Sequence, residues 1–282
     1  MKSLKSYKYL VFLIPSFLLF TFAVIIPFFM GINISFTNWD GISLHYDYVG
    51  FKNFIRLFSD QNIVRPIWNT FEFAILSTVL NNIFSLLFAI LITRWVVGKN
   101  FIKLIFFIPM ALSTVLAAFI WGFIYKDVFS SLFSIQSPLG NPAAVIPAIV
   151  IISLWNSIGS NLIIYIAGLQ NIPQMYYEAS SIDGANLWQQ FRYITLPMLV
   201  PTFTVCITLT FTNTLREFAT VMAATGGGPA DYSETISIFI YKNLFSFQKA
   251  GYGQAVSFVF MFILVVIGIV LTRFFRSKEV ET

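Results

Sequence analysis

Long apolar stretches alternate along the chain with short segments that carry most of its charges. A helix rises about 1.5 Å per residue, so roughly 20 apolar residues cross the 30 Å hydrocarbon core of a membrane. Six stretches fit this length, and we expect a membrane-spanning helix in each. The predicted spans are residues 9–34, 68–93, 104–125, 143–170, 197–222 and 250–273. The pattern predicts an all-α integral membrane protein in which residues 1–282 form a single domain.

Length alone does not define the fourth and the first of these spans. Residues 128–177 carry no charge and are too long for one helix, but residues 134–142 (SIQSPLGNP) have turn chemistry and are expected to form a loop. The basic group Lys2, Lys5 and Lys8 before the first span is also how a secretory signal begins. The apolar part is longer than the roughly 7–15 residues of a signal core, and no small-x-small cleavage site follows it. We therefore expect a retained first helix.

The composition agrees with a membrane protein. Apolar residues make up 57% of the chain and charged residues 10%, whereas a soluble domain is about 25% charged. The net charge of +5 comes from basic residues beside apolar runs rather than from a basic stripe, so no nucleic-acid partner is expected. Cys206 lies in an apolar run and is the sole cysteine, and His45 is the sole histidine. We expect no metal site, no cofactor and no Cys–His nucleophile.

The distribution of basic residues predicts the orientation. Six spans place both termini on one side of the membrane. The side with the termini carries ten basic residues: Lys2, Lys5, Lys8, Arg94, Lys99, Lys103, Arg192, Arg273, Arg276 and Lys278. The other side carries six: Lys52, Arg56, Arg65, Lys126, Lys242 and Lys249. Because cytoplasmic loops are enriched in Lys and Arg, the termini are expected in the cytoplasm, and the protein in the inner or plasma membrane.

Two outer connections, residues 35–66 and 223–249, are long for a helical bundle. They are either solvated loops or a surface for an external partner, and composition does not choose between these readings. The inner connection, residues 171–196, has more structure than a connector needs. Pro173 suits a first helical turn and Gly184 a left-handed stop, so a helix, a glycine turn and a second helix are expected.

The exposed chemistry of residues 171–196 allows two interpretations. Glu178 and Asp183 stand beside the small residues Ala179 and Ser180, which makes a socket for a basic group of a partner protein. Alternatively the segment lies on lipid and is anchored by Tyr176, Tyr177 and Trp188.

The spacing of this segment resembles a known motif. The segment resembles the EAA loop of inner-membrane permeases of binding-protein-dependent ABC importers. The matching residues are Glu178-Ala179-Ser180, Gly184 and, after nine residues, Ile194-x-Leu196-Pro197. Ser180 replaces the second alanine of that motif. Thr225-Gly226-Gly227-Gly228-Pro229 and residues 35–41 (SFTNWDG) are similar to the sugar-importing branch, which includes the maltose and sn-glycerol-3-phosphate permeases. The resemblance covers nearly the whole chain.

The resemblance implies a function and partners. Residues Glu178, Ala179, Ser180, Asp183 and Gly184 would form a coupling helix and turn that dock into a cytoplasmic ATPase. The expected partners are a second, homologous permease subunit, two copies of the ATPase, an extracytoplasmic sugar-binding protein, membrane lipid, and a sugar, in particular an oligosaccharide. No G-x-x-x-x-G-K-[ST] phosphate loop is present, so ATP hydrolysis is expected in the partner and not in this chain.

Polar residues within the spans are candidates for the substrate path, because sugars need hydrogen-bonding groups at mid-membrane depth. Those in the fourth and fifth spans are Ser153, Asn156, Ser157, Ser160, Asn213, Thr214 and Glu217. The alternative, structural interpretation is that these Ser and Asn side chains form hydrogen bonds that hold neighbouring helices together. Asn161, Asn81, Asn82, Trp121 and Tyr125 are further candidates. Two alternatives stay open: a secondary transporter driven by an ion gradient, and an ABC importer for a polyol or glycerol phosphate.

Overall fold

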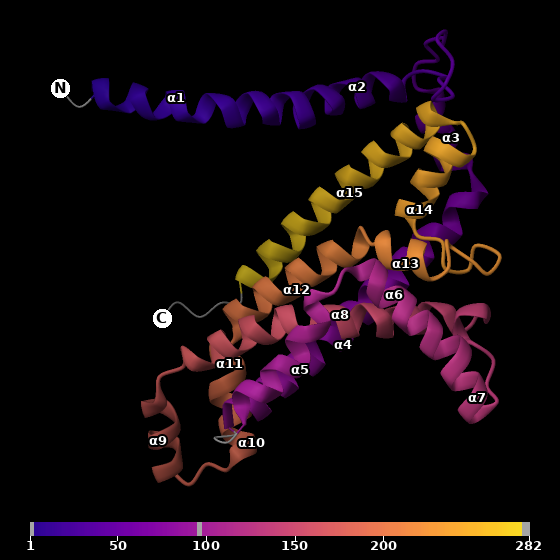
Figure 1. The fold of residues 1–282 in the computed structure, drawn as a ribbon. Coiled ribbons are helices and arrows are strands. Elements are labelled where there is room, and N and C mark those ends of the chain that lie inside the picture. The colour runs from indigo at the N-terminus through magenta and orange to yellow at the C-terminus, as the bar shows by residue number, and fades with distance from the viewer. Residues whose placement is uncertain (1–2, 95–97, 278–282) are drawn as a thin grey trace. The chain divides into compact units, whose positions relative to one another are not determined.

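The computed structural model describes residues 3–94 and 98–277, and it divides into two compact units (Figure 1). The first unit holds the described residues up to Gln61 together with Phe239–Met261. The second holds Asn62–Ile238, apart from the undescribed residues 95–97, and the described residues from Phe262 onward. Within the described residues the elements are helical, and the one β-bridge pairs Thr37 with Tyr48.

The first unit begins with an almost continuous helix. It consists of α1 (Ser3–Phe20), a π-helical turn (Thr21–Ile25) and α2 (Ile26–Ser35), which agrees with the predicted first span. Its side chains from Phe12 onward are mostly exposed and apolar, as on a helix that faces lipid. The unit also contains α3 (Lys52–Ser59), the second half of α14 (Ile236–Tyr241), a π-helical turn (Lys242–Ser246) and the first half of α15 (Ala250–Arg276).

The second unit is a helical bundle built on α4 and α8. In chain order its elements are a 3₁₀ turn (Gln61–Ile63), α4 (Val64–Arg94), α5 (Lys99–Ala111), α6 (Thr114–Phe123), a π-helical turn (Ile124–Val128), α7 (Phe129–Phe133), a 3₁₀ turn (Pro138–Gly140), α8 (Val145–Gln170), α9 (Gln174–Ile182), α10 (Leu187–Gln190), a π-helical turn (Phe191–Thr195), α11 (Leu196–Met198), α12 (Val200–Leu215) and α13 (Ala219–Ala224). The second half of α15 also belongs to it.

Helices α4 and α8 pack against each other along much of their length, and α12 and α5 pack on this pair. One cluster of buried side chains includes Phe73 and Ile149, and another includes Leu162, Tyr165 and Cys206. Cys206 is therefore a packing residue, as its apolar surroundings in the sequence predict.

Five of the described helices are long and apolar enough to cross a membrane, and a sixth span is obtained when one bent helix pair is counted as a unit. The five are Phe12–Ser35, Gln61–Thr93, Thr114–Phe133, Val145–Gln170 and Ala250–Arg276. The bent pair is Leu187–Met198 and Val200–Leu215. The predicted all-α membrane architecture is confirmed, and the helix boundaries differ from two of the predicted spans.

The predicted third span, residues 104–125, is not one helix. α5 ends at Ala111 and α6 begins at Thr114. Pro109 lacks an amide hydrogen and Leu112 is extended, with ψ of 147°. Ser113 then starts the new helix, because its hydroxyl accepts a hydrogen bond from the Leu116 amide over 3.2 Å. The candidate span lies further along the chain, at Thr114–Phe133.

The predicted fifth span, residues 197–222, is also interrupted. The helix pair bends by 67° at Leu199, between Pro197 and Pro201, and α12 ends at Leu215. Proline cannot donate to the preceding helical turn, which explains a bend at this place. Helix α13 starts separately, because Glu217 Oε1 accepts a hydrogen bond from the Thr220 amide over 2.7 Å.

Candidate functional site

The segment between α8 and α12 has the predicted local structure. α9 ends at Ile182, Gly184 has a φ of +80°, and α10 follows. Only glycine adopts this left-handed conformation at no steric cost. Asn186 opens α10 with a capping box, in which its side chain and that of Gln189 each accept the other residue's amide hydrogen. The chain therefore makes a helical hairpin before it enters α12 (Figure 1).

The two arms of this hairpin are α9 and residues 187–195. Side chains whose pairing the sequence did not indicate join them. The hydroxyls of Tyr177 and Thr195 lie 2.9 Å apart within hydrogen-bond distance. Gln190 Nε2 donates to Ser181 Oγ over 2.9 Å and to Ser180 Oγ over 3.2 Å. Ser180 thus faces the opposite arm of the hairpin rather than presenting a free small surface. No sequence signal identified Gln190, because its partners come from the other arm.

The outer surface of the hairpin combines acidic and apolar groups. Glu178, Ala179, Asp183 and Gly184 are exposed. In the described part of the chain, the Glu178 carboxylate makes no hydrogen bond or ion pair. Ile182 is 88% exposed, and Trp188 and Leu187 are also exposed. An unpaired carboxylate beside apolar side chains can receive a partner surface that contributes one cation and apolar groups.

A seam of polar side chains joins α4, α8 and α12 within the second unit. Asn161 Nδ2 donates to Asn81 Oδ1 and to Thr210 Oγ1, each over 2.8 Å. Asn81 Nδ2 donates to Ser157 Oγ over 2.8 Å. Tyr165, one turn further, donates to Asn82 Oδ1 over 2.6 Å. Interhelical contacts of this kind hold membrane helices together, so this seam matches the structural interpretation of the polar residues, in which they join helices.

The other candidates on α8 are partly engaged by α5 or by their own helix. Asn156 Nδ2 donates to the carbonyl oxygens of Pro109 (2.8 Å) and Leu112 (3.2 Å), where α5 ends. Ser160 is exposed, and its hydroxyl lies 3.2 Å from the Met110 sulfur. Ser153 is buried, and its carbonyl accepts from Ser157 Oγ over 2.7 Å.

The candidates at the end of α12 are held by neighbouring residues of the chain. Thr214 Oγ1 donates to the Thr210 carbonyl over 2.8 Å, and Glu217 caps α13. Asn213 is exposed, and its Oδ1 accepts from Arg216 Nη2 over 3.0 Å. The polar link between α8 and α12 runs instead through Asn161 and Thr210. Thr210 was not predicted, because one threonine in an apolar run carries no distinguishing signal.

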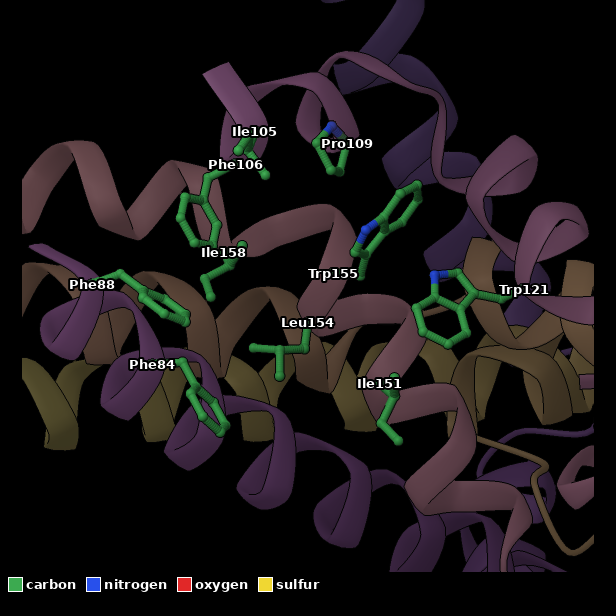
Figure 2. Close-up of a pocket in the computed structure, with 10 residues that line it drawn as sticks. All are labelled: Phe84, Phe88, Ile105, Phe106, Pro109, Trp121, Ile151, Leu154, Trp155 and Ile158. Atoms are coloured by element: carbon green, nitrogen blue, oxygen red, sulfur yellow. The ribbon is translucent and has the colours of Figure 1, made fainter. Parts of the chain in front are cut away.

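An aromatic pocket of about 360 Å³ lies along α8, next to Asn156 (Figure 2). Its walls come from α4, α5, α6 and α8, and five of the ten lining side chains are aromatic: Phe84, Phe88, Phe106, Trp121 and Trp155. The indole rings of Trp121 and Trp155 meet edge to face at 6.1 Å. The Trp121 Nε1 is buried and makes no hydrogen bond among the described residues. The pocket can take a flat or ring-shaped apolar surface.

Residues 81–278 match the family described as "Binding-protein-dependent transport system inner membrane component". The chain is 34% identical over 279 residues to the probable starch degradation products transport system permease protein AmyD of Thermoanaerobacterium thermosulfurigenes, which covers 97% of this chain and 95% of the relative. It is 34% identical over 245 residues to the trehalose/maltose transport system permease protein MalF of Thermococcus litoralis, covering 81% and 82%. The sn-glycerol-3-phosphate transport system permease protein UgpA of Escherichia coli (strain UTI89 / UPEC) is 29% identical over 253 residues, covering 86% and 85%.

The fold has a close counterpart among solved structures. A chain of a bacterial ABC transporter involved in the import of the acidic polysaccharide alginate superposes with a TM-score of 0.83 at 22% identity. The match covers 97% of this chain and 96% of the other. At this identity the likeness concerns the fold.

Proposed function

The chain belongs to the family of inner-membrane components of binding-protein-dependent transport systems, and we propose that it is the permease subunit of an ABC importer that translocates a sugar, in particular an oligosaccharide. The family match carries this proposal, because it spans residues 81–278 and includes the whole hairpin that resembles the EAA loop. Two relatives that share 34% of their residues with this chain are named for starch products and for trehalose and maltose.

The proposed assembly contains four kinds of protein subunit. This chain pairs with a second, homologous permease, and the pair receives sugar from an extracytoplasmic binding protein. Two copies of a cytoplasmic ATPase hydrolyse ATP, since this chain has no phosphate-binding loop. The transmembrane domain spans the whole chain, with both termini in the cytoplasm. The bias of basic residues toward the side with the termini supports this orientation; Lys2 and Lys278 of that set lie outside the described residues.

We place the contact with the ATPase on the hairpin, at Glu178, Ala179, Ser180, Asp183 and Gly184, where Ser180 would contribute by holding the two arms together rather than by direct contact. The exposed, unpaired carboxylate of Glu178 and the exposed Ile182 support a protein partner there. The bonds between the Gln190 amide and the serines of α9 keep the two arms together, so that a force on α9 is passed to α12.

We place the sugar path along the α8 and α12 residues Ser153, Asn156, Ser157, Ser160, Asn213, Thr214 and Glu217. Ser160 and Asn213 are exposed, and the aromatic pocket next to Asn156 offers ring faces. Several other members are engaged by neighbouring helices, so in this role they would shape the path through those contacts rather than bind directly.

The proposed role of the hairpin is tested with Glu178→Gln in the complete transporter reconstituted in liposomes. We expect sugar uptake and binding-protein-stimulated ATP hydrolysis to fall together, because removal of a charged hydrogen-bond partner costs about 1.5–3 kcal/mol. Asp127→Asn is the matched control, since it neutralises an exposed carboxylate far from the hairpin in sequence and should leave both rates unchanged. Unchanged rates in Glu178→Gln would contradict the docking role.

The same preparation separates this function from a secondary transporter. Uptake by an ABC importer requires ATP and the binding protein and persists when an ionophore collapses the ion gradients. If uptake instead stops with the ionophore while ATP remains, the chain is driven by an ion gradient. A panel that includes a polyol and glycerol phosphate tests the alternative substrates.

A further inference from the structure

The short helix α3 has three faces of different chemistry. Asn53 and Leu57 are buried against the rest of the first unit. Phe51, just before the helix, and Ile55 and Phe58 within it form an exposed apolar stripe at i, i+4 and i+7, in which Phe58 is 82% exposed. The remaining exposed face carries the basic residues Lys52 and Arg56, and the exposed Ser59 lies one turn after Ile55, at the border of the stripe. Three such faces are typical of a helix that contacts protein, water and an apolar environment at the same time.

The start of α3 is attached to the end of the first candidate span. Asn53 Nδ2 donates to the main-chain oxygens of Ser35 and Thr37, over 2.9 and 2.8 Å. Ser35 is the last residue of that span. Asn53 is 9% exposed, and the Ser35 carbonyl that it bonds is one of those that a helix leaves unpaired at its end. The first turn of α3 therefore lies beside the end of the first candidate span.

The end of α3 is attached to the beginning of the last candidate span. Tyr252 OH donates to Asp60 Oδ2 over 2.8 Å, and the Arg56 guanidinium lies 4.6 Å from the centre of the Tyr252 ring. Tyr252 is the third residue of the span Ala250–Arg276. At the same junction, Gly251 lies against the Thr37 carbonyl so closely that a Cβ atom would collide with it. Both ends of α3 are thus held at the ends of membrane spans.

We propose that α3 lies in the membrane interface and that its exposed stripe of Phe51, Ile55 and Phe58 is buried among lipids at the headgroup boundary. Eight residues span about 12 Å, so a helix held at both ends at this level runs along the membrane surface. Phenylalanine and isoleucine are favoured below the headgroups, and Lys52 on the adjoining face can reach a lipid phosphate. This inference rests on the membrane location of the family and not on the transport function.

The proposal is tested with nitroxide spin labels on the complete transporter in lipid nanodiscs. The native Cys206 is buried, so cysteines introduced by Phe58→Cys and Ile55→Cys are the sites labelled in this chain. Arg56→Cys, on the polar face of the same helix, and Leu44→Cys, on the exposed loop before it, are the controls. Collision rates with oxygen, which concentrates in lipid, and with a water-soluble nickel complex then give the depth of each label.

We expect the labels at positions 55 and 58 to lie roughly 5–10 Å below the headgroup boundary and those at 56 and 44 to contact water. If positions 55 and 58 are as accessible to nickel as position 56, the proposal is wrong. Nickel access at 55 and 58 that is lost only when the binding protein is added would identify a protein-docking face and also overturn it. Because the two labelled positions are independent, one remains informative if the other variant does not assemble.

Discussion

The side-chain amide of Asn161 donates a hydrogen bond to Asn81 Oδ1 over 2.8 Å, across 80 positions of sequence. The same amide also donates to Thr210 Oγ1, so one side chain joins α8 to α4 and to α12. These three helices form the centre of the second unit, which indicates that the polar residues of the spans first stabilise the bundle. The sugar path that we propose would therefore run beside this seam, on the side of α8 where the aromatic pocket and the exposed Ser160 lie.

The seam should contribute measurably to stability. Asn161→Ala removes both interhelical bonds and leaves Asn81 Oδ1 with Ser85 as its remaining donor. Hydrogen bonds between membrane helices average about 0.6 kcal/mol in double-mutant cycles, with a maximum near 1.7. We expect a coupling energy of about that average between Asn81→Ala and Asn161→Ala, measured from unfolding free energies in bicelles. Additive effects of the two substitutions would show that the bond contributes nothing.

The close approach of α8 to α5 requires glycine at position 159. A Cβ atom there would lie 2.6 Å from the Phe106 carbonyl oxygen, a main-chain atom that cannot rotate away. We expect Gly159→Ala to destabilise the protein by roughly 1–3 kcal/mol, the usual cost of overpacking, and to lower its melting temperature.

Gly122→Ala in α6 is the matched control for Gly159→Ala, because a Cβ atom at Gly122 has no neighbour within 4 Å. A helical Gly→Ala change without a clash stabilises by roughly 0.5–1 kcal/mol. Equal melting temperatures for the two variants would contradict the packing argument.

The left-handed turn of the hairpin should affect coupling through backbone conformation alone. Gly184 has a φ of +80°, and a Cβ atom would meet nothing within 4 Å. Gly184→Ala therefore costs only the left-handed strain, roughly 1–2 kcal/mol, whereas Gly184→Asn is tolerated better. We expect uptake to fall more in the alanine than in the asparagine variant, with Gly140→Ala unchanged as control. The opposite order would show that the turn conformation is not what matters.

The loop that follows α2 should resist acid. Asp40 accepts hydrogen bonds from the Ser43 hydroxyl and from the amides of Ser43 and Ile42, and these bonds lower its pKa from 3.8 to about 2. Because the pKa is lower in the folded state, the stabilisation is complete above pH 3.8 and is lost as the pH falls through about 2.

Trp39, whose indole donates to the Ser43 carbonyl over 2.9 Å, reports on this loop. In protein labelled with fluorotryptophan, the Trp39 fluorine resonance should shift with a midpoint near pH 2 and should not titrate in Asp40→Asn. The resonance is assigned by its loss in Trp39→Phe. A midpoint near pH 4 would refute the hydrogen-bond argument.

Several elements followed from the sequence alone. The lengths of the apolar stretches determined the all-helical membrane fold, because a spanning helix must satisfy its backbone internally over about 20 apolar residues. Pro173 determined the start of α9, because its ring fixes φ, and Gly184 determined its end, because glycine adopts a positive φ without strain. The spacing from Glu178 to Pro197 indicated the family that the comparison over residues 81–278 then showed.

The tertiary structure alone decided which polar side chains meet and where the spans break. Asn161 could have faced a substrate path, but its partners Asn81 and Thr210 are distant in sequence and come together only when three helices pack. The sequence contains Pro109 and Pro201, but a proline does not by itself end a membrane helix, because neighbouring groups can satisfy the carbonyls that it frees. In this structure Asn156 bonds the carbonyls of Pro109 and Leu112, and the chain begins a new helix after them. Local patterns fix the length and ends of a helix, whereas the partner of each buried polar group depends on neighbours that only the assembled bundle supplies.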